Sequence, residues 1–121
     1  MSLLLREFDG ADALDVALSE RLIDGLAAAI DARGEAILAV SGGRTPAGLF
    51  KCLSDAPLDF SKVMITLTDE RCVPRDHPDS NTKMVQRLLL QRNAKQSRFI
   101  SLYDPAMDLA AQRQTLNVQF N

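Results

Sequence analysis

The chain has 121 residues, of which 46% are hydrophobic and 25% charged, so it is long enough for one globular domain and too short for two. Its 14 basic and 16 acidic residues give a formal net charge of −2, which disfavours a nucleic-acid partner because such proteins usually carry a basic face. No stretch approaches the roughly eighteen apolar residues of a membrane span, and the charged amino terminus does not resemble a secretory signal. We therefore expect a single domain over residues 1–121 with no membrane partner.

The first third of the chain predicts a strand, a helix and a second strand. The apolar run Leu3–Leu5 is typical of a short strand. Between Ala11 and Arg33 a leucine or isoleucine recurs at every fourth position and Gly34 supplies a stop, which predicts a long amphipathic helix. The continuous apolar run Ala36–Val40 predicts a strand buried on both faces, as in a parallel sheet covered by helices on each side.

The same alternation of helix and strand continues to the end of the sequence. We expect a helix from Pro46 to about Ser54, a strand over Val63–Leu67, a helix over Asn81–Leu90, a strand over Phe99–Leu102 and a helix from Ala106 onward. This order predicts an α/β fold with a doubly wound, mostly parallel, Rossmann-like sheet and helices on both faces. In such sheets a ligand binds outside the carboxyl ends of the strands.

The loop after the strand Ala36–Val40 has the composition of an anion-binding turn. Two glycines bring bare N–H groups close to a ligand, and the following helix points the positive end of its dipole at the same place. The loop matches neither the GxxxxGK[ST] nor the GxGxxG fingerprint, which disfavours a nucleotide. A tight turn whose glycines serve packing alone is the alternative. The candidate phosphate-binding residues are Ser41, Gly42, Gly43, Arg44 and Thr45.

The loop after the strand Val63–Leu67 carries three consecutive charges, Asp69, Glu70 and Arg71. Alternation along an extended segment places Asp69 and Arg71 on one side and Glu70 on the other. Asp69 is then suited to handle a proton and Arg71 to bind a phosphate through a bidentate, charge-assisted contact. A solvated turn is the alternative.

The remaining polar residues offer fewer sites. His77 is the single histidine, and we expect it to be an exposed loop residue. Ser80 is a suitable cap for the following helix, and Asn81 at its start is a further candidate for the ligand crevice. Cys52 and Cys72 form no CxxC pair, so we expect two reduced thiols, no metal site and no cofactor.

Taken together, the segments SGGRTP, DERCVP and DSN, in this order and spacing, resemble the 6-phosphogluconolactonase family. Glucosamine-6-phosphate deaminases share the fold and a similar glycine loop. They more typically carry DEY and SYH where this chain has Asp69–Arg71 and Ser80–Thr82, so the resemblance to the lactonases is closer. It covers nearly all of this chain but only the amino-terminal half of those enzymes.

The resemblance implies a cytoplasmic hydrolase of the pentose phosphate pathway that opens 6-phosphoglucono-δ-lactone to 6-phosphogluconate without a metal or cofactor. The partner would be a small-molecule sugar phosphate, with no nucleic acid and no membrane. By position, the glycine loop would cradle the phosphate, Arg71 would contact it and Asp69 would help to organise the catalytic centre. Asp69 is accordingly the candidate catalytic residue.

One departure from the family bears on activity. The resembling lactonases are about twice as long, and their later half carries a Gly-Asp-Gly-His motif whose histidine activates the attacking water. This chain has no such motif, and His77 does not match it. We therefore expect a truncated form or a fragment, with an exposed sheet edge that favours self-association. The alternatives are a catalytically inactive sugar-phosphate binding module and a relative of the deaminases.

Overall fold

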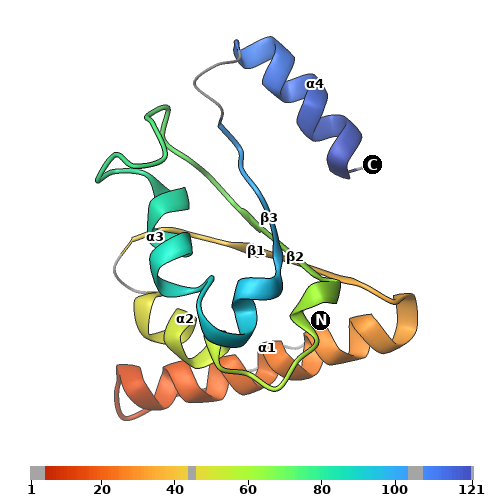
Figure 1. Ribbon diagram of the computed structural model, residues 1–121. Coiled ribbons are helices and arrows are strands. Elements are labelled where there is room, and N and C mark those ends of the chain that lie inside the picture. Colours follow the sequence, from red (N-terminus) through yellow and green to blue (C-terminus); the bar gives the residue numbers. More distant parts are fainter. Residues whose placement is uncertain (1–4, 44–45, 104–107, 121) are drawn as a thin grey trace.

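The computed structural model describes residues 5–43, 46–103 and 108–120, and it has the alternating α/β order expected from the sequence (Figure 1). In the described residues the elements are α1 (Ala11–Arg33), β1 (Ala36–Val40), α2 (Ala47–Ser54), the 3₁₀ helix η1 (Phe60–Lys62), β2 (Val63–Leu67), α3 (Asn81–Leu88), the 3₁₀ helix η2 (Arg92–Gln96), β3 (Arg98–Ile100) and α4 (Leu109–Phe120).

The three strands form one parallel sheet in the order β1-β2-β3, which confirms the predicted fold class. The register between β1 and β2 runs from Ala36 opposite Val63 to Val40 opposite Leu67. One further hydrogen bond, from the Thr68 N–H to the Val40 carbonyl at 2.8 Å, continues the pairing past the end of β2. The loops that follow β1 and β2 therefore leave the sheet at the same edge.

Helix α1 has the bounds that the sequence predicts. It ends because Gly34 adopts a left-handed conformation, with φ of 81°, and donates its N–H to the Ile30 carbonyl at 2.7 Å. Only the later part of its leucine stripe is covered. Leu26 is buried, whereas Leu14 and Leu18 remain 43% and 39% exposed. Contacts of α1 with α2 and β1 anchor it to the sheet.

The hydrophobic core lies against one face of the sheet. Alternate residues of β2, which point to the same side, all belong to it. Helices α2 and α3 cover that side with large apolar side chains, and burial of this size is the main stabilising term for a domain of this length. The fully buried members include Phe50, Leu53, Phe60, Val63, Ile65, Val85 and Leu89.

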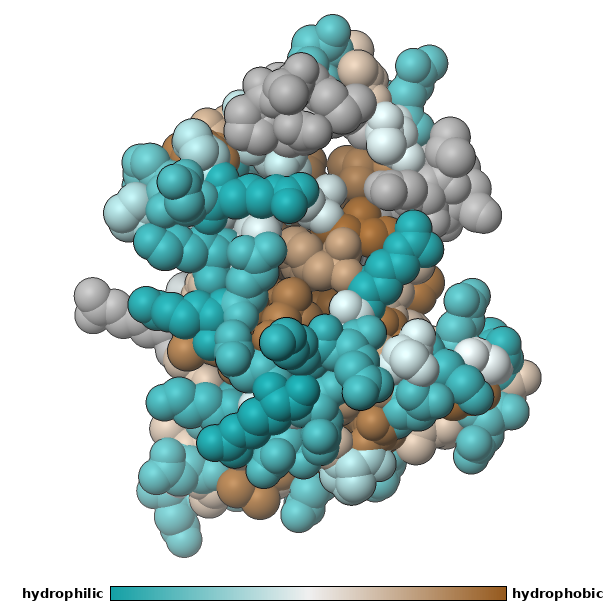
Figure 2. Space-filling model, in the orientation of Figure 1, coloured by the Kyte–Doolittle hydropathy of each residue, from teal (hydrophilic) through white to brown (hydrophobic). Residues whose placement is uncertain are grey.

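The opposite side of β1 is open in the described part of the chain. Ile37 is 56% exposed and Ala39 is also exposed, so the burial of both faces expected for this strand is not reached there. Helix α4 lies beyond the end of β3, apart from α1, α2 and α3 (Figure 1). Figure 2 shows further hydrophobic surface in a hollow on one side of the molecule, bordered by hydrophilic side chains.

Other boundaries differ from the predictions by a few residues. Helix α2 begins at Ala47, and Pro46 occupies the cap position, where its carbonyl accepts the first helical hydrogen bond. Leu5 is 77% exposed and in no strand, and the rest of the strand predicted over residues 3–5 lies outside the described residues, as does Ala106. None of the helices in the described ranges is long and apolar enough to cross a bilayer.

Candidate active site

A cleft of about 470 Å³ lies between the glycine loop and the first turns of α3. Gly43, from the loop after β1, and Arg71, from the loop after β2, both line it. The two loops thus share one cavity at the edge where the parallel strands end, as expected for a ligand site in an open α/β sheet.

Asn81, the first residue of α3, connects the two loops. Its side-chain amide donates to the Asp69 carbonyl, with 3.2 Å between Nδ2 and the oxygen. The same carboxamide lies against Gly42, where an added Cβ would overlap it. Asn81 is only 7% exposed and lines the cleft. Asn81 therefore lies at the crevice, between the two loops.

Gly43 has φ of 98°, in the left-handed region that favours glycine. Together with Ala47 at the start of α2, it forms the wall of the cleft on the side of the first loop. A helix start carries free N–H groups and a partial positive charge, so this wall is suited to an anion.

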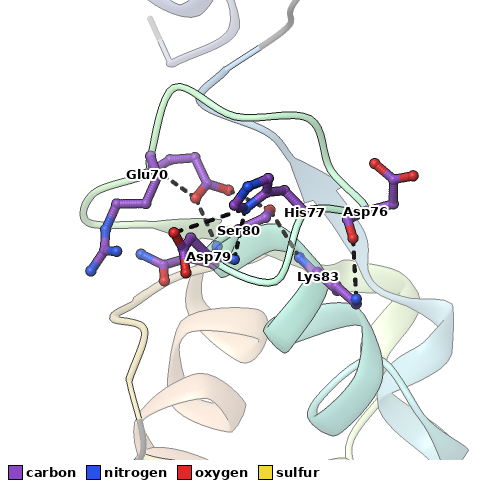
Figure 3. A network of polar contacts seen from close by, with 8 residues as sticks. Glu70, Asp76, His77, Asp79, Ser80 and Lys83 are labelled. Carbon is purple, nitrogen blue, oxygen red and sulfur yellow. Dashed lines mark hydrogen bonds and ion pairs between the residues drawn. The ribbon is translucent and has the colours of Figure 1, made fainter.

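Among the described residues near the cleft, Glu70 makes the largest group of polar contacts. Oε1 accepts hydrogen bonds from the backbone N–H groups of Arg71 at 2.8 Å and Asn81 at 2.7 Å. Oε2 accepts from Thr82, from its N–H at 2.8 Å and its hydroxyl at 2.6 Å, and from the Ser80 hydroxyl at 3.3 Å. Figure 3 shows Glu70 reaching from its loop towards the start of α3. The sequence assigned this residue no role.

The Glu70 carboxylate titrates below its usual range. Partial burial by itself raises the pKa, but the hydrogen bonds from the Thr82 hydroxyl and from the N–H groups of Arg71, Asn81 and Thr82 outweigh it and lower the pKa overall. The carboxylate is therefore ionised at neutral pH.

Ser80 caps α3 as the sequence predicts. Its hydroxyl oxygen accepts from the Lys83 N–H at 3.3 Å while its backbone is extended, the usual geometry of a cap. The Lys83 ammonium donates to the Asp76 carbonyl at 3.1 Å, which ties the loop before α3 to the helix (Figure 3).

His77 interacts with the turn that follows it. Its Nδ1 accepts a hydrogen bond from the Asp79 N–H at 3.0 Å, so the proton of the neutral ring lies on Nε2 (Figure 3). Asp79 lines the cleft, whereas His77 is absent from its described lining.

The charges that line the described part of the cleft are mostly positive. Arg71, Lys83 and Arg87 are basic and Asp79 is acidic, a balance that favours an anionic ligand. The sequence reasoning missed Lys83 and Arg87. Their spacing of four residues, which places two side chains on one face of a helix, was the available signal.

The other predicted site residues lie farther from the cleft or outside the described residues. Ser41 and Asp69 are exposed in their loops, and neither belongs to the described lining. The Asp69 carboxylate accepts from the Thr68 hydroxyl at 3.3 Å. Arg44 and Thr45 lie outside the described residues.

The described residues offer no evident metal site. No group of three or more His, Cys, Asp and Glu side chains gathers there in a way that could hold an ion. Cys52 is partly buried and Cys72 exposed, and both are free thiols. The chemistry that the cleft can offer from these residues is therefore that of arginine, lysine, amide and carboxylate groups.

A parallel α/β sheet with a glycine turn and a cleft lined mostly by basic side chains at its carboxyl edge is typical of open-sheet α/β proteins. The profile of the family described as glucosamine-6-phosphate isomerases/6-phosphogluconolactonase matches residues 9–120. The chain belongs to this family.

Similar curated proteins are named 6-phosphogluconolactonase. The one from Pseudomonas aeruginosa is 45% identical over 92 residues, which cover 76% of this chain and 39% of that protein. The one from Rhizobium meliloti is 47% identical over 106 residues, which cover 88% of this chain and 46% of that protein. The chain thus spans less than half the length of these relatives.

Solved structures agree with this assignment. A 6-phosphogluconolactonase from Shewanella baltica superposes with a TM-score of 0.85 at 39% identity, covering 90% of this chain and 48% of that one. A monomeric glucosamine-6-phosphate deaminase superposes with a TM-score of 0.75 at 22% identity, which shows a shared fold alone.

Proposed function

We propose that the chain binds a sugar phosphate in the cleft and supplies the phosphate-binding part of a 6-phosphogluconolactonase. Such an enzyme hydrolyses 6-phosphoglucono-δ-lactone to 6-phosphogluconate. The observation that carries the proposal is that Gly43 and Arg71 line the same cleft in a chain whose relatives bear that name.

In this proposal the phosphate lies between the glycine loop and Arg71. A helix start contributes only about 0.3–1 kcal/mol to anion binding. Micromolar affinity requires about 8 kcal/mol, so backbone donors alone are insufficient. The Arg71 guanidinium offers two parallel, charge-assisted hydrogen bonds, and Lys83 and Arg87 add positive potential along α3. Ser41, Gly42, Arg44, Thr45 and Asn81 complete the proposed binding set.

Hydrolysis needs a base in addition to this binding set. A water must lose a proton as it attacks the lactone carbonyl, after which the ring C–O bond breaks and the ring oxygen gains a proton. His77 is poorly suited to that role because its Nδ1 already accepts from the Asp79 N–H. We propose that the base comes from the later half of the family fold, and that Asp69 helps to organise the catalytic centre.

His77 lies outside the described lining of the cleft, and its Nδ1 accepts from the Asp79 N–H. This arrangement also supports a second candidate, a sugar-phosphate binding module without catalytic activity. Both candidates share the cleft and differ only in turnover. A deaminase acting on amino sugar phosphates ranks below them, because the curated relatives reported above are named as lactonases. Ammonia release from glucosamine 6-phosphate would identify that activity.

The experiment combines calorimetric titration with a hydrolysis assay. We expect 6-phosphogluconate to bind the chain, and lactone hydrolysis to appear only when the later half of a relative is added as a second polypeptide. Binding without hydrolysis in the mixture would favour the inactive module. Absence of binding at millimolar ligand would refute both candidates.

We propose in addition a cytoplasmic location, a mechanism without a cofactor, and self-association of the chain when it is alone. The open side of β1 supports self-association, since Ile37 presents apolar surface beside a strand edge.

A further inference from the structure

A single carboxylate oxygen links two residues of the cleft wall. Oε1 of Glu70 accepts from the N–H groups of both Arg71 and Asn81, which are ten residues apart in sequence and both line the cleft. Oε2 holds the next residue of α3, Thr82, through its N–H and its hydroxyl. Glu70 thereby ties the loop after β2 to the first turn of α3 (Figure 3).

These contacts extend to the glycine loop through Asn81. The Asn81 backbone is held by Glu70, while its side chain donates to the Asp69 carbonyl and lies against Gly42. A shift of Glu70 would therefore displace the backbone of Arg71. It would also displace the Asn81 carboxamide, which lies between the two loops.

Glu70 also occupies the N-terminal end of α3, which leaves the start of α2 as the helix end that is free for a ligand. The N–H groups of Asn81 and Thr82 point to the Glu70 carboxylate, and the Lys83 N–H points to the Ser80 hydroxyl. These are the first three N–H groups of α3, so its positive end is already neutralised by an internal anion. An anionic ligand in the cleft must instead use Arg71 and the side formed by Gly43 and α2.

We propose that Glu70 is a positioning residue of the sugar-phosphate cleft, which fixes the backbone of Arg71 and Asn81 so that the Arg71 guanidinium and the glycine loop act on one anion. The inference rests on the proposed function, because the anion is the phosphate of the proposed ligand. Glu70 itself makes no contact with that ligand.

The test is Glu70→Gln, with Asp76→Asn as the matched control. Both substitutions remove one negative charge from the same loop, and the Asp76 carboxylate points away from the network (Figure 3). Loss of a negative charge by itself should tighten the binding of an anion. A positioning role predicts the opposite for Glu70→Gln, because the glutamine NH₂ cannot accept the hydrogen bonds that one carboxylate oxygen accepts.

Two readouts separate this inference from the proposed function. We expect Glu70→Gln to raise the Kd for 6-phosphogluconate about tenfold and Asp76→Asn to leave it equal or slightly lower. We also expect faster hydrogen exchange at the amides of Arg71, Asn81 and Thr82 in Glu70→Gln, with the core amides unchanged. Thr82→Val, which removes only the hydroxyl donor, should give a smaller change in the same direction and replaces Glu70→Gln if that variant does not fold.

Binding that is unchanged or tighter in Glu70→Gln, or unchanged exchange at Arg71 and Asn81, would overturn the positioning role. If the unsubstituted chain binds no 6-phosphogluconate, the proposed function fails, and with it the ligand-related part of this inference. The exchange measurement then still decides whether Glu70 holds the two segments together.

Discussion

Asn81 lies against Gly42 at the point where the two loops meet, and a Cβ atom on Gly42 would overlap the Asn81 carboxamide. The contact joins the end of one strand to the helix that follows its neighbour. Because Asn81 is buried and its side-chain amide is hydrogen-bonded to the Asp69 carbonyl, the Asn81 side chain has little freedom to move aside.

Gly42→Ala should therefore destabilise the chain. Forcing a methyl group into a filled site costs about 1–3 kcal/mol, and we expect the free energy of unfolding in urea to fall by that amount. Gly25→Ala is the control, since Gly25 is an exposed helical residue with open space at its Cβ. That substitution should stabilise by about 0.5–1 kcal/mol. Equal effects of the two substitutions would show that the contact with Asn81 is unimportant.

Arg71→Ala should weaken the binding of 6-phosphogluconate. A hydrogen bond to a charged group contributes about 1.5–3 kcal/mol, so the Kd measured by calorimetry should rise roughly tenfold to a hundredfold. Arg71→Lys should recover part of the loss, because lysine keeps the charge but not the bidentate geometry. Arg75→Ala, in the same loop and outside the described lining, should leave the Kd within about twofold. Similar losses for Arg71→Ala and Arg75→Ala would mean that net charge alone governs binding.

The stability that Glu70 provides should depend on pH. Its pKa is lowered from 4.5 in the folded chain, so the unfolded chain binds the proton more readily. The contribution is then complete above the unfolded pKa and is lost as the pH falls through the lower, folded pKa. We expect the difference in unfolding free energy between the unsubstituted chain and Glu70→Gln to shrink as the pH drops below about 4.5.

Comparing the unsubstituted chain with Glu70→Gln isolates the titration of Glu70 from that of the other charged groups nearby. Asp69, Asp79, Arg71 and Lys83 are present in both, so their titration largely cancels. A difference that stays constant from neutral pH to about pH 3 would contradict the assignment of the ionised carboxylate as the hydrogen-bond acceptor.

The chain alone should self-associate through the open side of β1. Ile37→Lys places a charge on that side, where Ile37 is 56% exposed, and should shift the sedimentation profile towards the monomer at micromolar concentration. Leu14→Lys, on the exposed start of α1, is a control of the same chemistry and should have the smaller effect. A monomeric profile for the unsubstituted chain would refute self-association.

The sequence predicts those helices and strands whose bounds depend on residues that are close together in the chain. The helix Ala11–Arg33 was predicted with its true bounds because its end depends on one glycine, and the strands Ala36–Val40 and Val63–Leu67 because each is an apolar run between polar or glycine-containing segments. The exposure of Leu14 and Ile37 was not predictable, since it depends on which elements pack over them.

The same distinction applies to the site. The loops containing Gly43 and Arg71 were expected to meet because parallel strands share a carboxyl edge, and both line the cleft. Glu70 was assigned no role because its partners at the start of α3 lie 10 to 12 residues away, and the direction of its side chain depends on the path of the intervening loop. Three polar residues at the start of α3, without an acidic side chain in its first turn, were the only hint.

The most direct test of a shared site is an NMR titration with 6-phosphogluconate that follows the backbone amides of Gly43 and Arg71 together. We expect both signals to shift along one saturation curve with a single Kd, while the signal of the Gly25 amide on α1 stays in place. Movement of only one of the two signals, or two curves with different Kd values, would contradict a common phosphate site.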